Sequence, residues 1–550
     1  SSFKHLQHEG IIPFSDWERF SARLAGTLKV SEKFSVNAQV NFTNSGGLRP
    51  HSGDKSIMSS LSYHPTSFDI NDYQNPDGSM KDFSDGIIDN PRYLAEFSQL
   101  QDNVNRLVGG MGFDYQLTDW LSINYVAGLD QYSDQRSRIV PPGIDLSSQT
   151  GGFIIDERIN YREFNSNLLV TATKQLSDFN LSFTAGHSLT DIKVNRTNVR
   201  GENFVEPSFF DLSNTPAIFA SNDFRQNRFY GIIGIAKVDW RNSVYLEVTG
   251  RNDFSSTLPE ANRSFFYPST SLSWVFSENV NIPGLSFGKL RASCAQVGKD
   301  APPYSIGEYY RLGTNFPFGD VSGFGNTNVI GDPDLRPEIT TSIELGADLR
   351  FFNNRLSFDV TYFNQLSEDL ILSVPIANTT GFSRFVTNAG SVRNVCWEIL
   401  ANATPYRKGS FSWDISANWS TYEGRVESIR EGIEEVEFFN PFYIVNKIEE
   451  GGNIGDLYGR PLERDEAGDV LLNEAGFPFV RTDTISRVGN AIPDWVAGIT
   501  NTFNYKNWSA SVLIEYRKGG DLYDMGMRNA IRNGVHPWTV NRYQLATFDG

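Results

Sequence analysis

The chain has 550 residues and a formal net charge of −17, from 65 acidic and 48 basic side chains. This acidic balance argues against a nucleic-acid partner, which would favour a basic stripe. No apolar run approaches the roughly 18 residues of a membrane-spanning helix, so helical spans are excluded. Aromatic residues make up 13% of the chain, which is high for a soluble protein. The two cysteines, Cys294 and Cys396, are too few for a disulfide framework and fit small, outward-facing apolar positions of strands.

Apolar and polar residues alternate through most of the chain. In the first example, Phe20, Leu24 and Leu28 lie on one face of an extended segment and Arg19 and Arg23 on the other. A period of two predicts β-strands, and short turns between segments predict hairpins. In chain order the pattern predicts sixteen strands in eight hairpins and no convincing amphipathic helix; the strands are 19–30 with 34–43, 107–117 with 121–129, 162–176 with 181–189, 230–240 with 244–248, 266–276 with 290–294, 339–349 with 356–362, 397–403 with 411–419, and 495–505 with 508–516.

Three features of these strands favour a membrane over a soluble β-sandwich. The strands run nine to fourteen residues, which suits a tilted crossing of a bilayer. The connections within hairpins are short and those between hairpins are long, as in outer-membrane barrels. Aromatic side chains gather near the strand ends of the apolar face, at Trp120, Trp240, Phe352 and Trp508 beside the turns. We therefore predict an all-β fold, a large antiparallel transmembrane β-barrel closed on itself, with its apolar stripe against lipid and its polar stripe lining a wet lumen.

Several segments resemble the SusC/RagA family of TonB-dependent transporters. The stretch "RNDFSSTLPEANRSFFYPSTSLSWVFSE" (251–278) is similar to that family's R-D-G-S-S…N-R…Y-F-P-S run, and "GDPDLRPEITTSIELG" opens a second similar segment at 331–371. Further similar segments are 63–83, 290–300, 387–399 and 488–526, with Cys396 where the family usually has glycine. The similarity covers nearly the whole chain in order, which is far more specific than any single motif.

This resemblance implies a protein of the bacterial outer membrane. Family members are 22-stranded barrels of Bacteroidetes with an N-terminal plug; they import oligosaccharides, or peptides in the RagA branch, with energy delivered by TonB and a SusD-like lipoprotein as lid. We expect residues 1–550 to form the barrel portion, with about sixteen strands visible and with the plug, the TonB box and the last strands outside this chain. Neither a cofactor nor covalent chemistry on the cargo is expected. The alternatives are a peptide importer, a siderophore or vitamin receptor, a passive or secretion barrel, and a soluble surface protein that binds or degrades glycans.

Aromatic clusters in two long loops are the candidate cargo-binding residues. Sugars stack on aromatic rings and hydrogen-bond to Asn, Asp and Arg. The first cluster and its polar neighbour lie at Tyr304, Tyr309, Tyr310, Arg311, Phe316 and Phe318, and the second at Glu437, Phe438, Phe439, Asn440, Phe442 and Tyr443. The alternative is that these rings pack the loops together or dock the lid protein.

Charged residues inside the predicted lumen are Arg228, Arg291 and Glu344, which we expect to anchor the plug. No motif of a hydrolase, nucleotide-binding protein or redox enzyme occurs. The six histidines lack metal-ligand spacing, and "RDEAGD" (464–469) resembles a calcium loop without its full series of carboxylates. The sequence therefore predicts a transporter, without a metal site and without catalysis.

Overall fold

A single large antiparallel sheet of seventeen strands dominates the computed structural model, which describes residues 1–53, 56–144, 151–313, 323–433, 435–439, 444–474, 476–481 and 484–541. Each strand pairs with the next one of the sheet along the chain, so the sheet is an uninterrupted meander. Its strands are β1 (Ser2–Glu9), β2 (Asp16–Lys29), β3 (Phe34–Arg49), β4 (Gln99–Thr118), β5 (Leu121–Val140), β6 (Phe153–Leu176), β7 (Phe179–Glu202), β8 (Ala217–Trp240), β9 (Val244–Ser255), β10 (Ser264–Trp274), β11 (Leu285–Lys299), β15 (Glu338–Phe351), β16 (Leu356–Glu368), β19 (Gly390–Lys408), β20 (Phe411–Ile429), β25 (Pro493–Tyr505) and β26 (Trp508–Gly519).

All sixteen predicted strands are confirmed, in the predicted pairs. The longer connection between β10 and β11 also joins the expected partners, with Leu272 opposite Ala292 and Trp274 opposite Leu290. Several strands are longer than predicted: β6, β7 and β8 have 24 residues each. A bilayer crossing needs about 9–11 residues, so each of these strands is about twice as long as a crossing requires. Their added parts lack the apolar stripe that marked the predicted segments.

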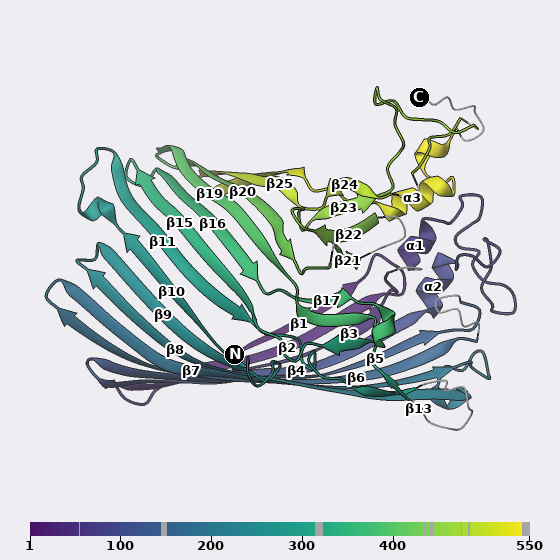
Figure 1. The fold of residues 1–550 in the computed structure, drawn as a ribbon, viewed down its shortest axis with the longest axis horizontal. Coiled ribbons are helices and arrows are strands. Elements are labelled where there is room, and N and C mark those ends of the chain that lie inside the picture. Colours follow the sequence, from purple (N-terminus) through teal and green to yellow (C-terminus); the bar gives the residue numbers. More distant parts are fainter. Residues whose placement is uncertain are drawn as a thin grey trace.

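The sheet is open. Among the described residues β1 pairs with β2 alone and β26 with β25 alone, and the sheet curves into a trough (Figure 1). The prediction that the strands of this chain close on one another is therefore not met. Both edges leave a row of backbone groups without a partner strand, which lipid cannot satisfy.

Short turns lie at one end of the trough and the long loops and α-helices at the other, at the left and right of Figure 1. The loops contain elements that the sequence analysis missed: three short helices and three small sheets. The helices are α1 (Ile57–Leu61), α2 (Pro91–Phe97) and α3 (Met525–Arg532), and the 3-10 turns are η1 (Leu212–Asn214), η2 (Phe276–Glu278), η3 (Asn378–Thr380) and η4 (Pro537–Thr539). The small sheets pair β12 (Tyr310–Gly313) with β13 (Gly323–Asn326), then β14 (Val329–Gly331), β18 (Arg384–Asn388) and β17 (Ile371–Pro375), and then β21 (Glu435–Phe439), β22 (Ile444–Glu449), β23 (Asp456–Gly459) and β24 (Ser486–Asn490).

Buried hydrophobic side chains cluster at the loop end rather than along the sheet. Phe153 and Leu94 belong to one such cluster, Leu335 to a second and Val426 to a third. Along the strands, by contrast, apolar side chains are exposed: Phe183 is 56% exposed and Ile514 62%. Because burial is what stabilises such residues in water, this large exposed face needs an apolar surrounding. No helix among the described residues is long and apolar enough to span a membrane.

The two cysteines lie on opposite faces of the sheet. Cys294 is exposed and lies opposite Ile343 on the apolar face, as predicted. Cys396 is buried, and the next residue of its strand, Trp397, points outward. Cys396 therefore points to the concave face, and its predicted outward orientation is wrong. Its cross-strand neighbours there are Phe363 and Tyr422.

Candidate functional site

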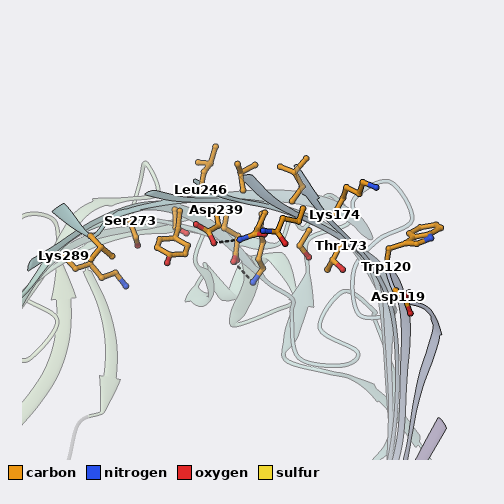
Figure 2. Close-up of a pocket in the computed structure, with 18 of the residues that line it drawn as sticks. Asp119, Trp120, Thr173, Lys174, Asp239, Leu246, Ser273 and Lys289 are labelled. Carbon is orange, nitrogen blue, oxygen red and sulfur yellow. Dashed lines mark hydrogen bonds and ion pairs between the residues drawn. The ribbon is translucent and has the colours of Figure 1, made fainter. Parts of the chain in front are cut away.

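The two faces of the large sheet differ sharply in chemistry. Residues that lie directly opposite one another on neighbouring strands form a row across the sheet, which we call a rung. The rung of Leu181, Val238 and Leu246 is apolar and lies on the convex face. The next rung, of Ser182, Lys237 and Glu247, is polar and lies on the concave face. Figure 2 shows Leu246 on one side of the curved sheet and Asp239, Ser273 and Lys289 on the other. The alternation read from the sequence thus produces a trough with a polar interior.

Near the short turns the concave face forms a hollow of about 1040 Å³ (Figure 2). Its wall carries an ion pair of 2.7 Å between Lys237 Nζ and Glu247 Oε2. Beside it, the side-chain amide of Asn180 donates to Asp239 Oδ2 at 3.1 Å. Such a wall offers many donors and acceptors to a polar solute. Among the described residues, no group of three or more His, Cys, Asp or Glu side chains could hold a metal ion.

Halfway along the trough, charged pairs and aromatic rings alternate on the concave face of β4, β5 and β6. Arg106 donates to Asp130 with an Nε–Oδ1 distance of 2.9 Å. In the same rung as Arg106, the rings of Tyr132 and Tyr161 stack with centroids 4.9 Å apart, and the Tyr161 hydroxyl donates to Glu163. Because these rings cover each other, they form a rigid part of the wall and not an open stacking platform.

Arg291 and Glu344, predicted to point inward, both lie on the concave face, since their neighbours Leu290 and Leu345 lie on the convex one. The guanidinium of Arg291 reaches over β15 to Asp359, with an Nη2–Oδ1 distance of 2.6 Å. It passes directly above Gly346, where a Cβ atom would lie 2.3 Å from Arg291 Nε. The glycine therefore lets this long side chain lie flat against the wall.

Arg228, also predicted to face the lumen, lies on the convex face instead. It is two residues from Tyr230, and residues two apart on a strand point to the same side. Its Nη2 lies 3.0 Å from Asp191 Oδ2, on the neighbouring strand. Arg228 is therefore outside the trough and cannot anchor anything within it.

At the loop end, α1 and α2 pack against the concave face of β5 and β6 through the cluster that contains Leu94, Val140 and Phe153. The guanidinium carbons of Arg138 and Arg200 lie 5.5 and 4.3 Å from the centre of the Phe153 ring. Sequence reasoning missed these two arginines. Both lie on the concave face of their strands, β5 and β7. Extending the alternation of those strands past their apolar segments would have predicted this orientation.

The four-stranded small sheet of β21 to β24 adds a polar network at the loop end. Lys447 in β22 is buried and pairs with Glu435 and Glu449, and its Nζ lies 4.5 Å from the centre of the Tyr458 ring. Burial alone would lower the pKa of Lys447, but the two carboxylates together raise it above its usual value. Lys447 therefore stays charged near neutral pH and holds β21 to β22.

The first predicted aromatic cluster is partly assembled. The Tyr304 and Tyr309 rings meet edge to face with centroids 6.2 Å apart, and the Tyr304 hydroxyl accepts a hydrogen bond of 3.2 Å from the Gln226 backbone amide. These two rings therefore hold the loop against β8. Tyr310, in β12, is 73% exposed. Phe316 and Phe318 lie outside the described residues.

The second predicted cluster begins in β21, whose residues include Glu437, Phe438 and Phe439. Asn440, Phe442 and Tyr443 lie outside the described residues. Figure 1 shows β13, the partner strand of β12, well apart from β21 at the loop end. The described parts of the two aromatic loops are therefore not brought together.

Comparison with known proteins identifies this architecture. The family profile described as "TonB dependent receptor-like, beta-barrel" matches residues 38–547. TonB-dependent receptor P26 of Formosa agariphila is 23% identical over 96% of this chain and 56% of its own length, and TonB-dependent receptor SusC of Bacteroides thetaiotaomicron is 27% identical over 54% of this chain and 32% of its own. The solved structure of the RagAB peptide transporter superposes with a TM-score of 0.78, at 17% identity, over 94% of this chain and 59% of that one, which shows the same fold. The chain thus spans less than three fifths of these relatives.

Proposed function

The chain belongs to the TonB-dependent receptor-like β-barrel family and is a protein of the outer membrane, and from this premise we propose that its parent protein imports nutrient oligomers, most readily oligosaccharides. The observation that carries the proposal is the two-faced sheet. Its convex face matches hydrocarbon, and its concave face offers a polar path from the loops to the turns. Transport changes no bond of the cargo, so the protein needs no catalytic residues.

The open trough supports the further proposal that parts of the parent protein outside this chain complete the barrel and plug it. Additional strands would pair with β1 and β26 and satisfy the backbone groups of both edges. A plug would fill the trough and meet inward charges such as Arg291 and Glu344. Coupling to TonB and a SusD-like lipoprotein lid over the loops follow from the similarity to SusC and RagAB. This similarity favours oligomer import over siderophore or vitamin import.

Peptide import is the second candidate, because RagAB, whose structure has the same fold, is a peptide transporter. The test is calorimetric binding of defined oligosaccharides and of short peptides to the full-length protein with its lid. Saturable binding of oligosaccharides alone supports the first proposal. Saturable binding of peptides alone would replace it with the second.

We also propose that aromatic residues of the two loops contact cargo. Replacing Tyr310 by alanine, or Phe438 and Phe439 together, should weaken cargo affinity about fivefold per ring, since a ring contact contributes roughly 1 kcal/mol. Leu522→Ala is the matched control, because Leu522 is 90% exposed outside both loops. Calorimetry that finds the same affinity for all variants would assign these rings to loop packing or lid docking instead.

A further inference from the structure

Two basic side chains face each other on the convex side of the sheet, one rung beyond its apolar band. Arg162 of β6 lies directly opposite Lys193 of β7 and opposite Gln131 of β5. The preceding rung toward the turns contains Leu129 and Phe164 on β5 and β6 and Asp191 on β7, and the rungs below it hold apolar residues such as Ala127, Leu168 and Leu189. Arg162 and Lys193 therefore lie where the hydrocarbon-facing band ends.

This pair is electrostatically unbalanced. Like charges directly opposite each other on neighbouring strands repel and destabilise the sheet. Among the described residues, no carboxylate forms an ion pair with either side chain. Asp191, two residues before Lys193 on the same face, lies within electrostatic reach of Lys193 but accepts its hydrogen bonds from Arg228 at 3.0 Å and from Gln226 Nε2 at 2.9 Å. Arg158, two rungs further out opposite Thr197, adds another positive charge to the same face.

We propose that Arg162 and Lys193 bind the phosphate groups of anionic lipids in the outer leaflet of the membrane. A guanidinium matches phosphate oxygens with two parallel hydrogen bonds, and an ammonium adds a mobile positive charge. The rung lies on the loop side of the apolar band, which faces out of the cell in barrels with short periplasmic turns. Basic side chains at this height meet lipid headgroups, whose acyl chains cover the apolar rungs below.

Lipid, and not free phosphate, is the occupant because of this position. The binding rung continues directly into the apolar face, so a lipid that placed its headgroup here would lay its chains on Leu129 and Phe164. A free anion gains nothing from that apolar surface. The proposal depends on membrane insertion of the barrel and is independent of which cargo the protein imports.

The test measures binding of lipid A to the full-length protein in phosphatidylcholine nanodiscs. Each basic group near an anionic surface contributes roughly fivefold in affinity, so Arg162→Gln with Lys193→Gln should weaken binding about thirtyfold. Lys174→Gln is the matched control, because Lys174 lies opposite Leu181 on the same face at the turn end. The charge-conserving pair Arg162→Lys with Lys193→Arg should bind within a few fold of the unchanged protein.

Three results would overturn the proposal. Equal lipid A affinity of the charge-removing variant and the Lys174→Gln control would show that these charges do not bind the headgroup. An equal loss in the charge-conserving variant would mean that packing, and not charge, was disturbed. Displacement of lipid A by millimolar inorganic phosphate alone would show that the site recognises a free anion. In each protein, heat-modifiable gel migration verifies that the barrel is folded.

Discussion

At the scale of single residues, the polar wall depends on charged groups that neutralise one another across strands. Asp102 of β4 is 5% exposed and receives two hydrogen bonds from the guanidinium of Arg49, one of them with an Nε–Oδ1 distance of 2.7 Å. A carboxylate this deeply buried needs such a partner, because removing it from water costs several kcal/mol. Arg49 itself is about half exposed, so water screens part of the interaction.

Replacing Arg49 by glutamine should lower the free energy of unfolding by about 2 kcal/mol, because Asp102 remains buried without its counter-charge. The double variant Arg49→Gln with Asp102→Asn should recover more than half of that loss, since the buried charge is gone. The measurement is the midpoint of urea-induced loss of heat-modifiable migration. A double variant as unstable as the single one would contradict this account of the pair.

At the scale of elements, hairpin turns depend on residues that tolerate the left-handed backbone conformation. In the turn between β8 and β9, Arg241 and Asn242 both have a φ of 53°. The backbone N–H of Asn242 donates to Asp239 Oδ1 at 2.9 Å. Two consecutive positive φ values give a turn whose twist matches the flanking strands. Asparagine and glycine adopt this conformation at little cost, whereas β-branched residues do not.

Asn242→Val should therefore destabilise the protein by about 1–2 kcal/mol, while Asn242→Gly should change its stability by a few tenths only. Both variants remove the asparagine side chain, so their difference isolates the backbone effect. Urea titration followed by tryptophan fluorescence measures both. Equal stabilities for the valine and glycine variants would show that the turn conformation is not what limits this hairpin.

The sequence predicted elements well where its pattern was long and periodic. All sixteen strands have an apolar stripe of several residues, which sets both the period and the pairing. The small sheets of the loops were missed because strands of three to six residues, such as β14 and β22, are too short to show a period. The helix α3 was missed for the same reason, with only eight residues.

Two side-chain orientations were predicted wrongly, one for a charged residue and one for a cysteine. Arg228 was assigned by its charge to the lumen, although its spacing from Tyr230 places it on the convex face. Cys396 was assigned outward as a small apolar residue, although its neighbour Trp397 takes that side. The charge or polarity of a residue suggests which face of the sheet its side chain occupies. On a strand, however, the face is fixed by whether the residue is an odd or an even number of positions from a neighbour of known orientation. The loop aromatics have no such rule, so their roles stay a proposal.

At the scale of the whole molecule, the described part of the large sheet has no buried hydrophobic core along its strands. Its apolar convex face and its polar concave face therefore require different surroundings. Leu246 is 40% exposed on the convex face, and the adjacent Glu247 pairs with Lys237 on the concave one. The buried clusters lie at the loop end, where the chain meets water. Lipid outside and a polar conduit inside satisfy both faces at once.

The most direct test is a nitroxide scan of residues 244–248 in the full-length protein, reconstituted in lipid vesicles, with Cys294 and Cys396 replaced by serine. Labels at Val244, Leu246 and Val248 should collide preferentially with oxygen, which concentrates in hydrocarbon. Labels at Tyr245 and Glu247 should collide preferentially with a water-soluble nickel chelate. A scan without this alternation, or with oxygen favoured at Tyr245 and Glu247, would contradict the assignment of the convex face to lipid and the concave face to a conduit.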